Sequence, residues 1–97
     1  MINYLIKIEY EGTHFVGWQS QKNGKSIQDS IEKVLKKILK TKIRIIGAGR
    51  TDKGVHADMH VSNFFADKYF PLQSIISALN HYLPADIRVL GVYPINI

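Results

Sequence analysis

Near its N-terminus the chain reads INYLIKIEY, from Ile2 to Tyr10. Apolar or aromatic side chains occupy every second position, and most of the residues between them are polar. Because successive side chains of a β-strand point to opposite faces of a sheet, this period of two predicts a strand with one buried face. Tyr4 and Tyr10 fall on the apolar positions and are expected to face the core. This half-buried strand decides the fold, since the rest of the chain has to cover and pair it.

The rest of the chain alternates between helical and strand patterns. Ser26 and Asp29 have the spacing of a helix N-cap, and apolar residues follow at helical spacing, so a helix is predicted from Ile27 to about Lys40. Pro71 suits the first turn of a second helix, and Pro84 ends that helix. The predicted strands are Ile2–Tyr10, Ile43–Ile46, about Val55 to Phe65, and Ile87–Tyr93.

The resulting order, strand-helix-strand-strand-helix-strand, is that of the ferredoxin-like split βαβ arrangement. It predicts an α+β fold in which a four-stranded antiparallel sheet carries both helices on one face and leaves the other face open. The 97 residues are enough for one such domain and too few for two. We therefore expect residues 1–97 to form a single ferredoxin-like domain.

Charge is distributed unevenly along this chain. There are 13 Lys and Arg residues against 8 Asp and Glu, a net charge of +5, and ten of the basic residues fall between Lys22 and Lys53 with only three acidic ones. Such a stretch suits a polyanionic partner, either nucleic acid or an acidic membrane surface. The alternative is a solvated, lysine-rich helix.

Composition also excludes several classes of protein. The chain has no cysteine, so disulfides, thiolate zinc sites and thiol nucleophiles are excluded. No stretch approaches the ~20 apolar residues that span a bilayer, and the first strand is not preceded by a signal segment. We therefore expect a soluble, cytoplasmic protein.

The most unusual segment, residues 47–57, reads GAGRTDKGVHA. A dinucleotide-binding fingerprint needs glycine where Asp52 stands, and the glycines are not followed by the lysine and hydroxyl residue of a phosphate loop, so both motifs are excluded. Arg50 and Lys53 flank Asp52, and neighbouring cations favour its ionised form. An ionised carboxylate suits a hydrogen-bond acceptor or a nucleophile. The alternative is a surface turn in which Asp52 accepts backbone hydrogen bonds.

Within that segment, residues 49–57, GRTDKGVHA, closely resemble the signature of the TruA-type tRNA pseudouridine synthases. Further segments that are similar to patterns of this family occur in the same order along the chain. They are Tyr10-Glu11-Gly12 with Phe15, Gly17, Trp18, Gln19 and Gln21; Ser26-Ile27-Gln28 with Glu32; Val61-Ser62-Asn63-Phe64; and Asn80 with Leu83-Pro84 and Asp86-Ile87. The resemblance therefore covers nearly the whole chain.

The resemblance implies an isomerase that converts uridine to pseudouridine in the anticodon stem-loop of tRNA, without a metal or another cofactor. It implies that Asp52 is the nucleophile or essential carboxylate and that Arg50 helps to hold the extruded nucleotide. Phe15 is expected to pin the first loop to the sheet, whereas Trp18 could do the same or stack on a base. The RNA-binding residues implied in the same way are Trp18, Gln19, Lys22, Lys25, Lys53 and His56.

His56 and His60 share one face of a predicted strand, but no third ligand lies near them in the sequence, so a metal site is not expected. An orienting or structural role suits His56 better.

The resemblance also implies partners. In the family the active site lies between two ferredoxin-like halves, so this chain resembles the N-terminal half, with tRNA and a C-terminal half as its partners. The full-length enzyme is expected to be a homodimer, and the 97-residue chain alone is expected to be poorly active or inactive.

Two other functional classes stay open on the sequence alone. A non-catalytic RNA-binding module would use the sheet as its RNA platform, although the strand from Val61 to Phe65 lacks the basic-glycine-aromatic pattern of the RRM. A regulatory domain that pairs with a copy of itself through the open sheet face would leave the basic stretch unexplained.

Overall fold

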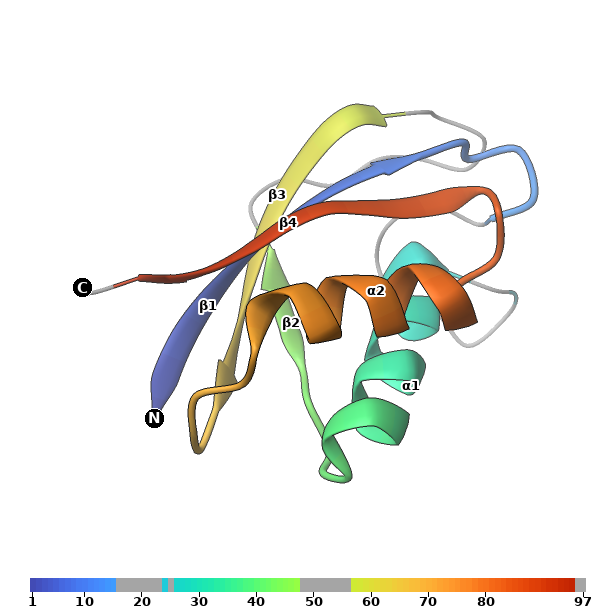
Figure 1. Cartoon of the computed structure of the whole chain (residues 1–97). Helices are drawn as coiled ribbons and strands as arrows, with labels where there is room; N and C mark the ends of the chain where they lie inside the picture. The colour runs from blue at the N-terminus through green and yellow to red at the C-terminus, as the bar shows by residue number, and fades with distance from the viewer. Residues whose placement is uncertain (16–23, 25, 48–56, 96–97) are drawn as a thin grey trace.

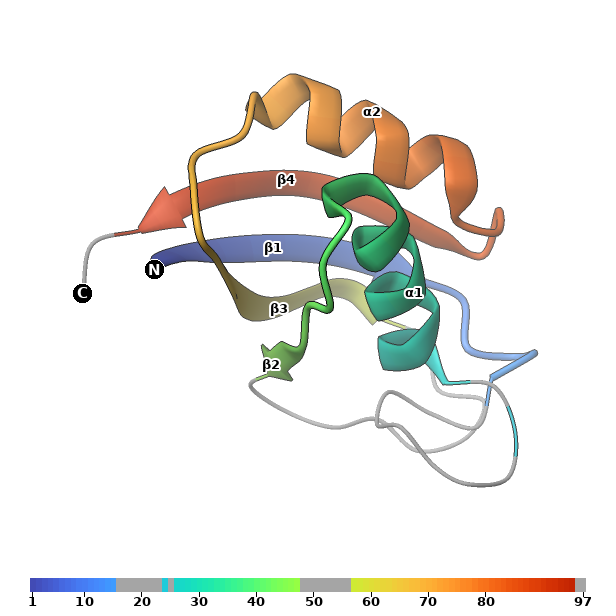
Figure 2. The same ribbon diagram turned by 90° about the horizontal axis from the view of Figure 1, so that it is seen from below.

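The computed structural model describes residues 1–15, 24, 26–47 and 57–95. The elements are β1 (Ile2–Tyr10), α1 (Ile27–Leu39), β2 (Ile45–Gly47), β3 (Ala57–Ala66), α2 (Leu72–Tyr82) and β4 (Ile87–Ile95). The strands form one antiparallel sheet in the order β2-β3-β1-β4 (Figure 1). Both helices lie on the same face of that sheet (Figure 2). The predicted ferredoxin-like α+β arrangement is confirmed.

The core fills the space between the sheet and the two helices. The residues that β1 contributes to it are Tyr4, Ile6, Ile8 and Tyr10. This confirms the alternation read from the sequence and the core-facing orientation of both tyrosines. The Tyr4 hydroxyl donates to the Lys68 carbonyl at 3.3 Å and accepts from the Phe70 N–H at 3.0 Å. A buried side chain of the central strand thus also fixes the connection from β3 to α2.

Helix α1 begins and ends as its sequence predicts. The fully buried Ser26 is the N-cap, and its Oγ accepts a hydrogen bond from the Asp29 N–H at 3.0 Å. At the other end Lys40 adopts a left-handed conformation, with φ of 61°, and its N–H donates to the Lys36 carbonyl at 2.9 Å. The helix proper therefore stops at Leu39.

Helix α2 begins one residue later than predicted. Pro71 is its N-cap and lies outside the first turn, so the helix starts at Leu72. Its end agrees with the prediction, because Leu83 is extended, with ψ of 150°, immediately before Pro84. A proline disfavours the helical conformation of the residue before it, which accounts for this stop. None of the helices in the described part of the chain is long and apolar enough to cross a membrane.

Within the described residues, β2 and β3 each end one residue beyond the prediction, and two other strand boundaries differ from it by two residues. Strand β2 starts at Ile45, two residues after the predicted start at Ile43, because its pairing with β3 begins there. Ile43 is buried in the core outside the ladder. Strand β4 continues to Ile95, two residues beyond the predicted end, and Pro94 pairs with β1 inside it. An edge strand tolerates the missing N–H of proline, and β4 is at the edge of the sheet.

Candidate functional site

The residues predicted to form the site lie outside the described residues. They are Arg50, Asp52, Lys53, His56, Trp18, Gln19, Lys22 and Lys25. The structure describes the scaffold on either side of them. Gly47 and Ala57 flank the segment that contains Asp52, and Phe15 and Ser26 flank the segment that contains Trp18.

The segment that contains Asp52 leaves β2 and enters β3 at different positions along the sheet. Gly47 pairs with Ser62 on β3, whereas Ala57 pairs with Tyr10 on β1. Ala57 and Ser62 are five residues apart on β3, which corresponds to about 17 Å along an extended strand. The first part of β3 therefore extends beyond β2, and within the described sheet its ladder partner there is β1.

Two side chains of α1 hold β2 in place. The Glu32 Oε2 accepts hydrogen bonds from the Ile45 N–H at 2.9 Å and from the Gln28 Nε2 at 3.0 Å. The same Gln28 Nε2 also donates to the Ile45 carbonyl at 3.2 Å. We call this arrangement the Gln28–Glu32 clamp. It binds both main-chain groups of Ile45, the first residue of a three-residue edge strand that ends at Gly47.

The sequence did not predict the clamp. Gln28 and Glu32 entered only as parts of a family pattern, and their helical spacing of four indicates that they lie on one side of α1. That spacing would have been the available signal, since Gln28 interrupts an otherwise apolar buried side. What the two residues bind depends on where β2 lies relative to α1 after folding, which no local pattern reveals.

Two polar residues of β3 are buried beside this scaffold. His60 and Ser62 are 7% and 3% exposed, and their β1 partners are the core residues Ile8 and Ile6. Burial lowers the pKa of His60 because the charged imidazolium loses its hydration. The His60 ring centroid lies 6.0 Å from that of Tyr10, the residue that pairs with Ala57. The scaffold therefore holds a neutral imidazole near pH 7 close to where β3 begins.

A metal site can be assessed only among the described residues. Among the described residues, no group of three or more His, Cys, Asp or Glu side chains could hold a metal ion. His60 lies in β3, and His56 lies outside the described residues.

Phe15 is 2% exposed and belongs to the core, so the prediction that it pins the first loop is confirmed. Its N–H donates to the Gly12 carbonyl at 3.1 Å, and the Glu11 N–H donates to the Asp86 carbonyl at 2.9 Å. The end of β1 is thereby bonded to the residue before β4. The chain enters the segment that contains Trp18 from a fixed point.

The sheet face opposite the helices carries a mixture of apolar and polar side chains. Among those whose ladder partners place them on it, the exposed large apolar residues are Ile46, Phe65 and Tyr93. Lys7 Nζ lies 5.5 Å from the centroid of the Tyr93 ring, and the Asn63 Nδ2 donates to the Asn3 Oδ1 at 3.1 Å. These exposed apolar side chains come from three of the four strands, β2, β3 and β4.

A depression of about 470 Å³ lies at the end of the sheet where β1 begins. Its lining residues are Met1, Ile2, Asn3, Phe65, Tyr69, Pro94 and Ile95. Ala57, by contrast, pairs with Tyr10 where β1 ends. We therefore do not assign this depression to the site around Asp52.

The scaffold described so far is a ferredoxin-like domain in which the buried Phe15 precedes one connection and the Gln28–Glu32 clamp precedes the other. Comparison with known proteins identifies the family to which the chain belongs. A family model described as tRNA pseudouridine synthase matches residues 6–96. The tRNA pseudouridine synthase A of Francisella tularensis subsp. holarctica (strain FTNF002-00 / FTA) is 44% identical over 96 residues, which are 99% of this chain and 37% of that protein. That of Aquifex aeolicus (strain VF5) is 41% identical over 96 residues, 99% of this chain and 40% of that protein.

This chain belongs to the tRNA pseudouridine synthase family. It spans 37% to 40% of the length of these curated relatives.

Proposed function

We propose that this chain is the half of a tRNA pseudouridine synthase that carries the catalytic aspartate, Asp52. The observation that carries the proposal is the family match over residues 6–96, which includes the GRTDKGVHA segment. The tRNA uridine acted on lies in the anticodon stem-loop, as the resemblance implies. Arg50 holds the target nucleotide beside Asp52.

The proposed reaction is an isomerisation in which atoms and electrons balance. Asp52 supplies the carboxylate that attacks ribose C1′ of the target uridine, and the bond between C1′ and uracil N1 breaks as the bond between Asp52 and C1′ forms. The released uracil anion turns, and its C5 bonds to C1′ as the bond between C1′ and Asp52 breaks, which regenerates the carboxylate. The C5 proton is then lost to solvent and N1 takes up a proton. The nucleotide must first leave the base stack, which costs a few kcal/mol, and the planar guanidinium of Arg50 can stack on it and bridge phosphate to carboxylate.

The described scaffold supports this role because it fixes a strand next to the segment that contains Asp52. The Gln28–Glu32 clamp fixes β2 immediately before the segment that contains Asp52. We further propose that a C-terminal half completes the active-site cleft, that the full-length cytoplasmic enzyme is a homodimer, and that the 97-residue chain alone is poorly active or inactive.

The test follows release of the C5 hydrogen from tRNA that contains uridine tritiated at C5. In the complete enzyme, Asp52→Asn should abolish tritium release while tRNA binding survives. Asp67→Asn is the control, because Asp67 is an exposed acid just beyond the end of β3. Retained turnover in Asp52→Asn would remove Asp52 from the central role. Turnover of the 97-residue chain at the rate of the complete enzyme would refute the need for a second half.

A further inference from the structure

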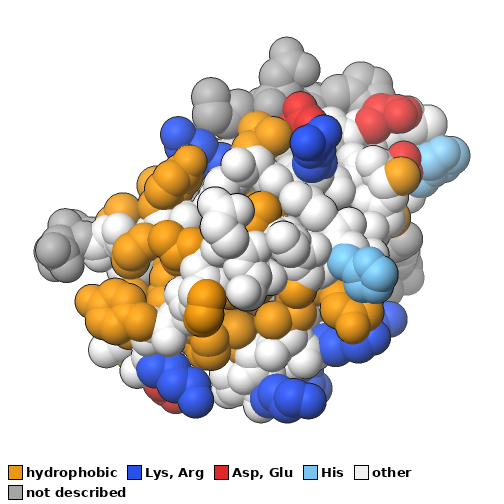
Figure 3. All heavy atoms as spheres, in the orientation of Figure 1, with side chains coloured by type: hydrophobic (Ala, Val, Ile, Leu, Met, Phe, Trp, Pro, Cys, Tyr) orange, Lys and Arg blue, Asp and Glu red, His pale blue; other side chains and the backbone are white. Residues whose placement is uncertain are grey.

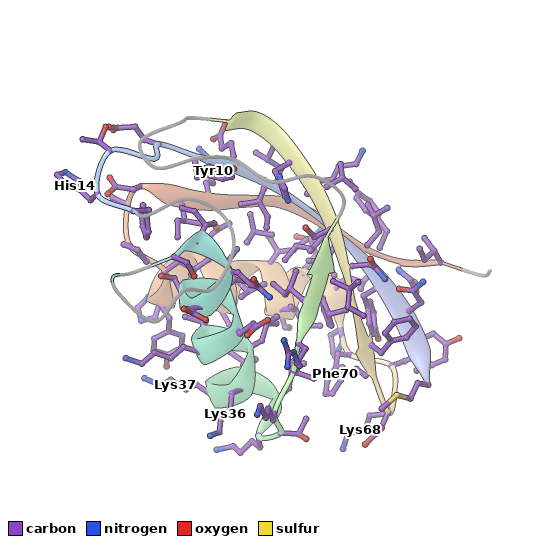
Figure 4. All side chains as sticks on the ribbon, turned by 180° about the vertical axis from the view of Figure 1, so that it is seen from behind. Tyr10, His14, Lys36, Lys37, Lys68 and Phe70 are labelled. Carbon is purple, nitrogen blue, oxygen red and sulfur yellow. The ribbon has the colours of Figure 1, made fainter. Side chains whose placement is uncertain are left out.

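The solvent side of α1 and its C-cap carry four exposed lysines, which we call the lysine face. They are Lys33, Lys36 and Lys37 on the helix and Lys40 at the C-cap. At 3.6 residues per turn the three helical positions fall within an arc of about 100° around the helix. Figure 4 shows Lys36 and Lys37 projecting from α1 on the side away from the sheet. Of the two acids on α1, Asp29 lies in the first turn and Glu32 is engaged in the clamp, so the lysine face carries excess positive charge.

A groove lies between this lysine face and the end of α2. The hollow has a volume of about 270 Å³, and its lining residues are Ser30, Lys33, Val34, Lys37, Tyr82 and Pro84. In Figure 3, basic side chains gather with a histidine and hydrophobic side chains where α1 lies beside the C-terminal part of α2. We call this hollow the α1–α2 groove.

The ammonium group of Lys37 lies over the Tyr82 ring at this groove. Lys37 Nζ lies 4.1 Å from the centroid of the Tyr82 ring, within the range of a cation–π contact. The His81 ring meets the Tyr82 ring edge-on, with centroids 4.8 Å apart. Tyr82 nevertheless stays 46% exposed, so the residue is accessible to a ligand. Lys33 precedes Lys37 by one helical turn, which puts the Cβ atoms of the two lysines about 5–6 Å apart.

We propose that the α1–α2 groove binds the backbone of the substrate RNA. In this site Lys33 and Lys37 contact neighbouring phosphates, and the exposed part of the Tyr82 ring packs on an unpaired base. The groove combines positive charge at its rim with apolar side chains, Val34 and Pro84, in its lining. That combination complements a strand that carries an anionic backbone and flat, largely apolar bases. The choice of RNA as the polyanion rests on the proposed function, whereas the residues of the groove are distinct from those of the site around Asp52.

The helix dipole accounts for only part of the lysine face. Cations in the last turn of a helix stabilise it, and Lys36 and Lys37 lie in the last turn of α1. Lys33 lies one turn earlier, and the dipole does not require an aromatic ring under Lys37. The pairing with Tyr82 and the hollow beside it therefore carry the proposal further than charge alone.

The test measures binding of a labelled tRNA transcript to the 97-residue chain at several salt concentrations. Lys37→Gln should weaken binding and reduce the slope of log K against log salt by about 0.7–0.9, the value of one lost phosphate contact. Lys68→Gln is a matched control, because Lys68 is also exposed and lies over an aromatic ring, 5.9 Å from the centroid of Phe70. Equal loss of affinity in the two variants would overturn the proposal, as would a wild-type chain that does not bind tRNA.

Tyr82 is tested separately from charge. Tyr82→Ala should weaken binding at least about 5-fold, the low end of base–aromatic stacking, and Tyr82→Phe should retain wild-type affinity. Far-UV circular dichroism establishes that both variants are folded. If Tyr82→Ala binds as the wild type does, or if anionic lipid vesicles depend on Lys37 and Tyr82 while tRNA does not, the proposed RNA site is wrong.

The outcome is separable from that of the proposed function. In the complete enzyme, Lys37→Gln should raise KM for tRNA and leave kcat unchanged, whereas Asp52→Asn should abolish kcat. Failure of Asp52→Asn to abolish turnover would refute the assignment of the nucleophile and leave the groove standing. Failure of the Lys37 and Tyr82 variants to alter binding would refute the groove and leave Asp52 standing.

Discussion

Removing the carboxylate of the Gln28–Glu32 clamp should loosen β2. Glu32→Ala deletes the acceptor of the Ile45 N–H and of the Gln28 Nε2. A hydrogen bond to a charged group contributes about 1.5–3 kcal/mol, and Glu32 is only partly buried. We therefore expect the free energy of unfolding to fall by about 2 kcal/mol, a substantial part of the roughly 5–15 kcal/mol typical of a domain.

Urea unfolding, followed by far-UV circular dichroism, measures this loss, and amide hydrogen exchange at Ile45 measures where it occurs. The urea midpoint should fall by about 1 M, given a dependence on urea of about 1–3 kcal/mol/M. Glu32→Gln keeps an oxygen acceptor and should lose about 1 kcal/mol or less. Glu11→Ala is the control for lost negative charge, because the exposed Glu11 side chain bonds only its neighbour Thr13 among the described contacts. The reasoning fails if Glu32→Ala and Glu11→Ala have the same midpoint, or if exchange at Ile45 is unchanged.

Two further predictions concern the described fold. Asn80→Ala should cost about 1 kcal/mol, because its side chain accepts from the Val89 N–H at 2.8 Å and donates to the Val89 carbonyl at 3.0 Å. The exposed Ser77→Ala controls for helix propensity, and equal urea midpoints for the two variants would contradict the prediction. His60 has a pKa below its unfolded value of about 6.5, so its neutral form stabilises the fold above pH 6.5 and this contribution is lost as the pH falls below that value. His60→Phe should therefore reduce the fall in urea midpoint between pH 7 and pH 5. His14→Gln, at an exposed histidine, is the control and should leave that fall unchanged. If the midpoint of His60→Phe falls with pH as steeply as that of the wild type, His60 is not the group responsible.

The fold was readable because each element depends on a local period. The alternation from Ile2 to Tyr10 specifies a half-buried strand whatever its neighbours are. Ser26 starts a helix because its hydroxyl oxygen accepts a hydrogen bond from the nearby Asp29 N–H. The two-residue errors in the strands occurred where a boundary depends on a distant partner. The apolar run from Ile43 suits a strand, but pairing starts at Ile45, opposite Phe64. Pro94 is acceptable within β4 because that strand is at the edge of the sheet.

The candidate site divides in the same way between local motif and distant contact. The resemblance that singled out Asp52 and Arg50 comes from contiguous residues, so sequence alone could name them. The clamp joins Glu32 to Ile45 across 13 positions, and the groove joins Lys37 to Tyr82 across 45. Contacts of this kind leave no periodic signal, because each depends on where two elements meet after folding.

The structure also changes how the basic stretch should be tested. Along the sequence, Lys22 to Lys53 forms one positive run that leads up to Asp52. In the fold, at 100° per residue, the clamp residues Gln28 and Glu32 lie on a different side of α1 from Lys33 and Lys37. The helix therefore faces β2 with hydrogen-bonding groups and faces solvent with positive charge. A loss of RNA affinity from neutralising the whole run would combine two effects, the groove and the segment around Asp52. Single substitutions at Lys37 and at Glu32 tell the groove and the clamp apart. Lys37→Gln should reduce the salt dependence of binding at a stability cost of about 1 kcal/mol or less, whereas Glu32→Ala should lower stability without removing a phosphate contact.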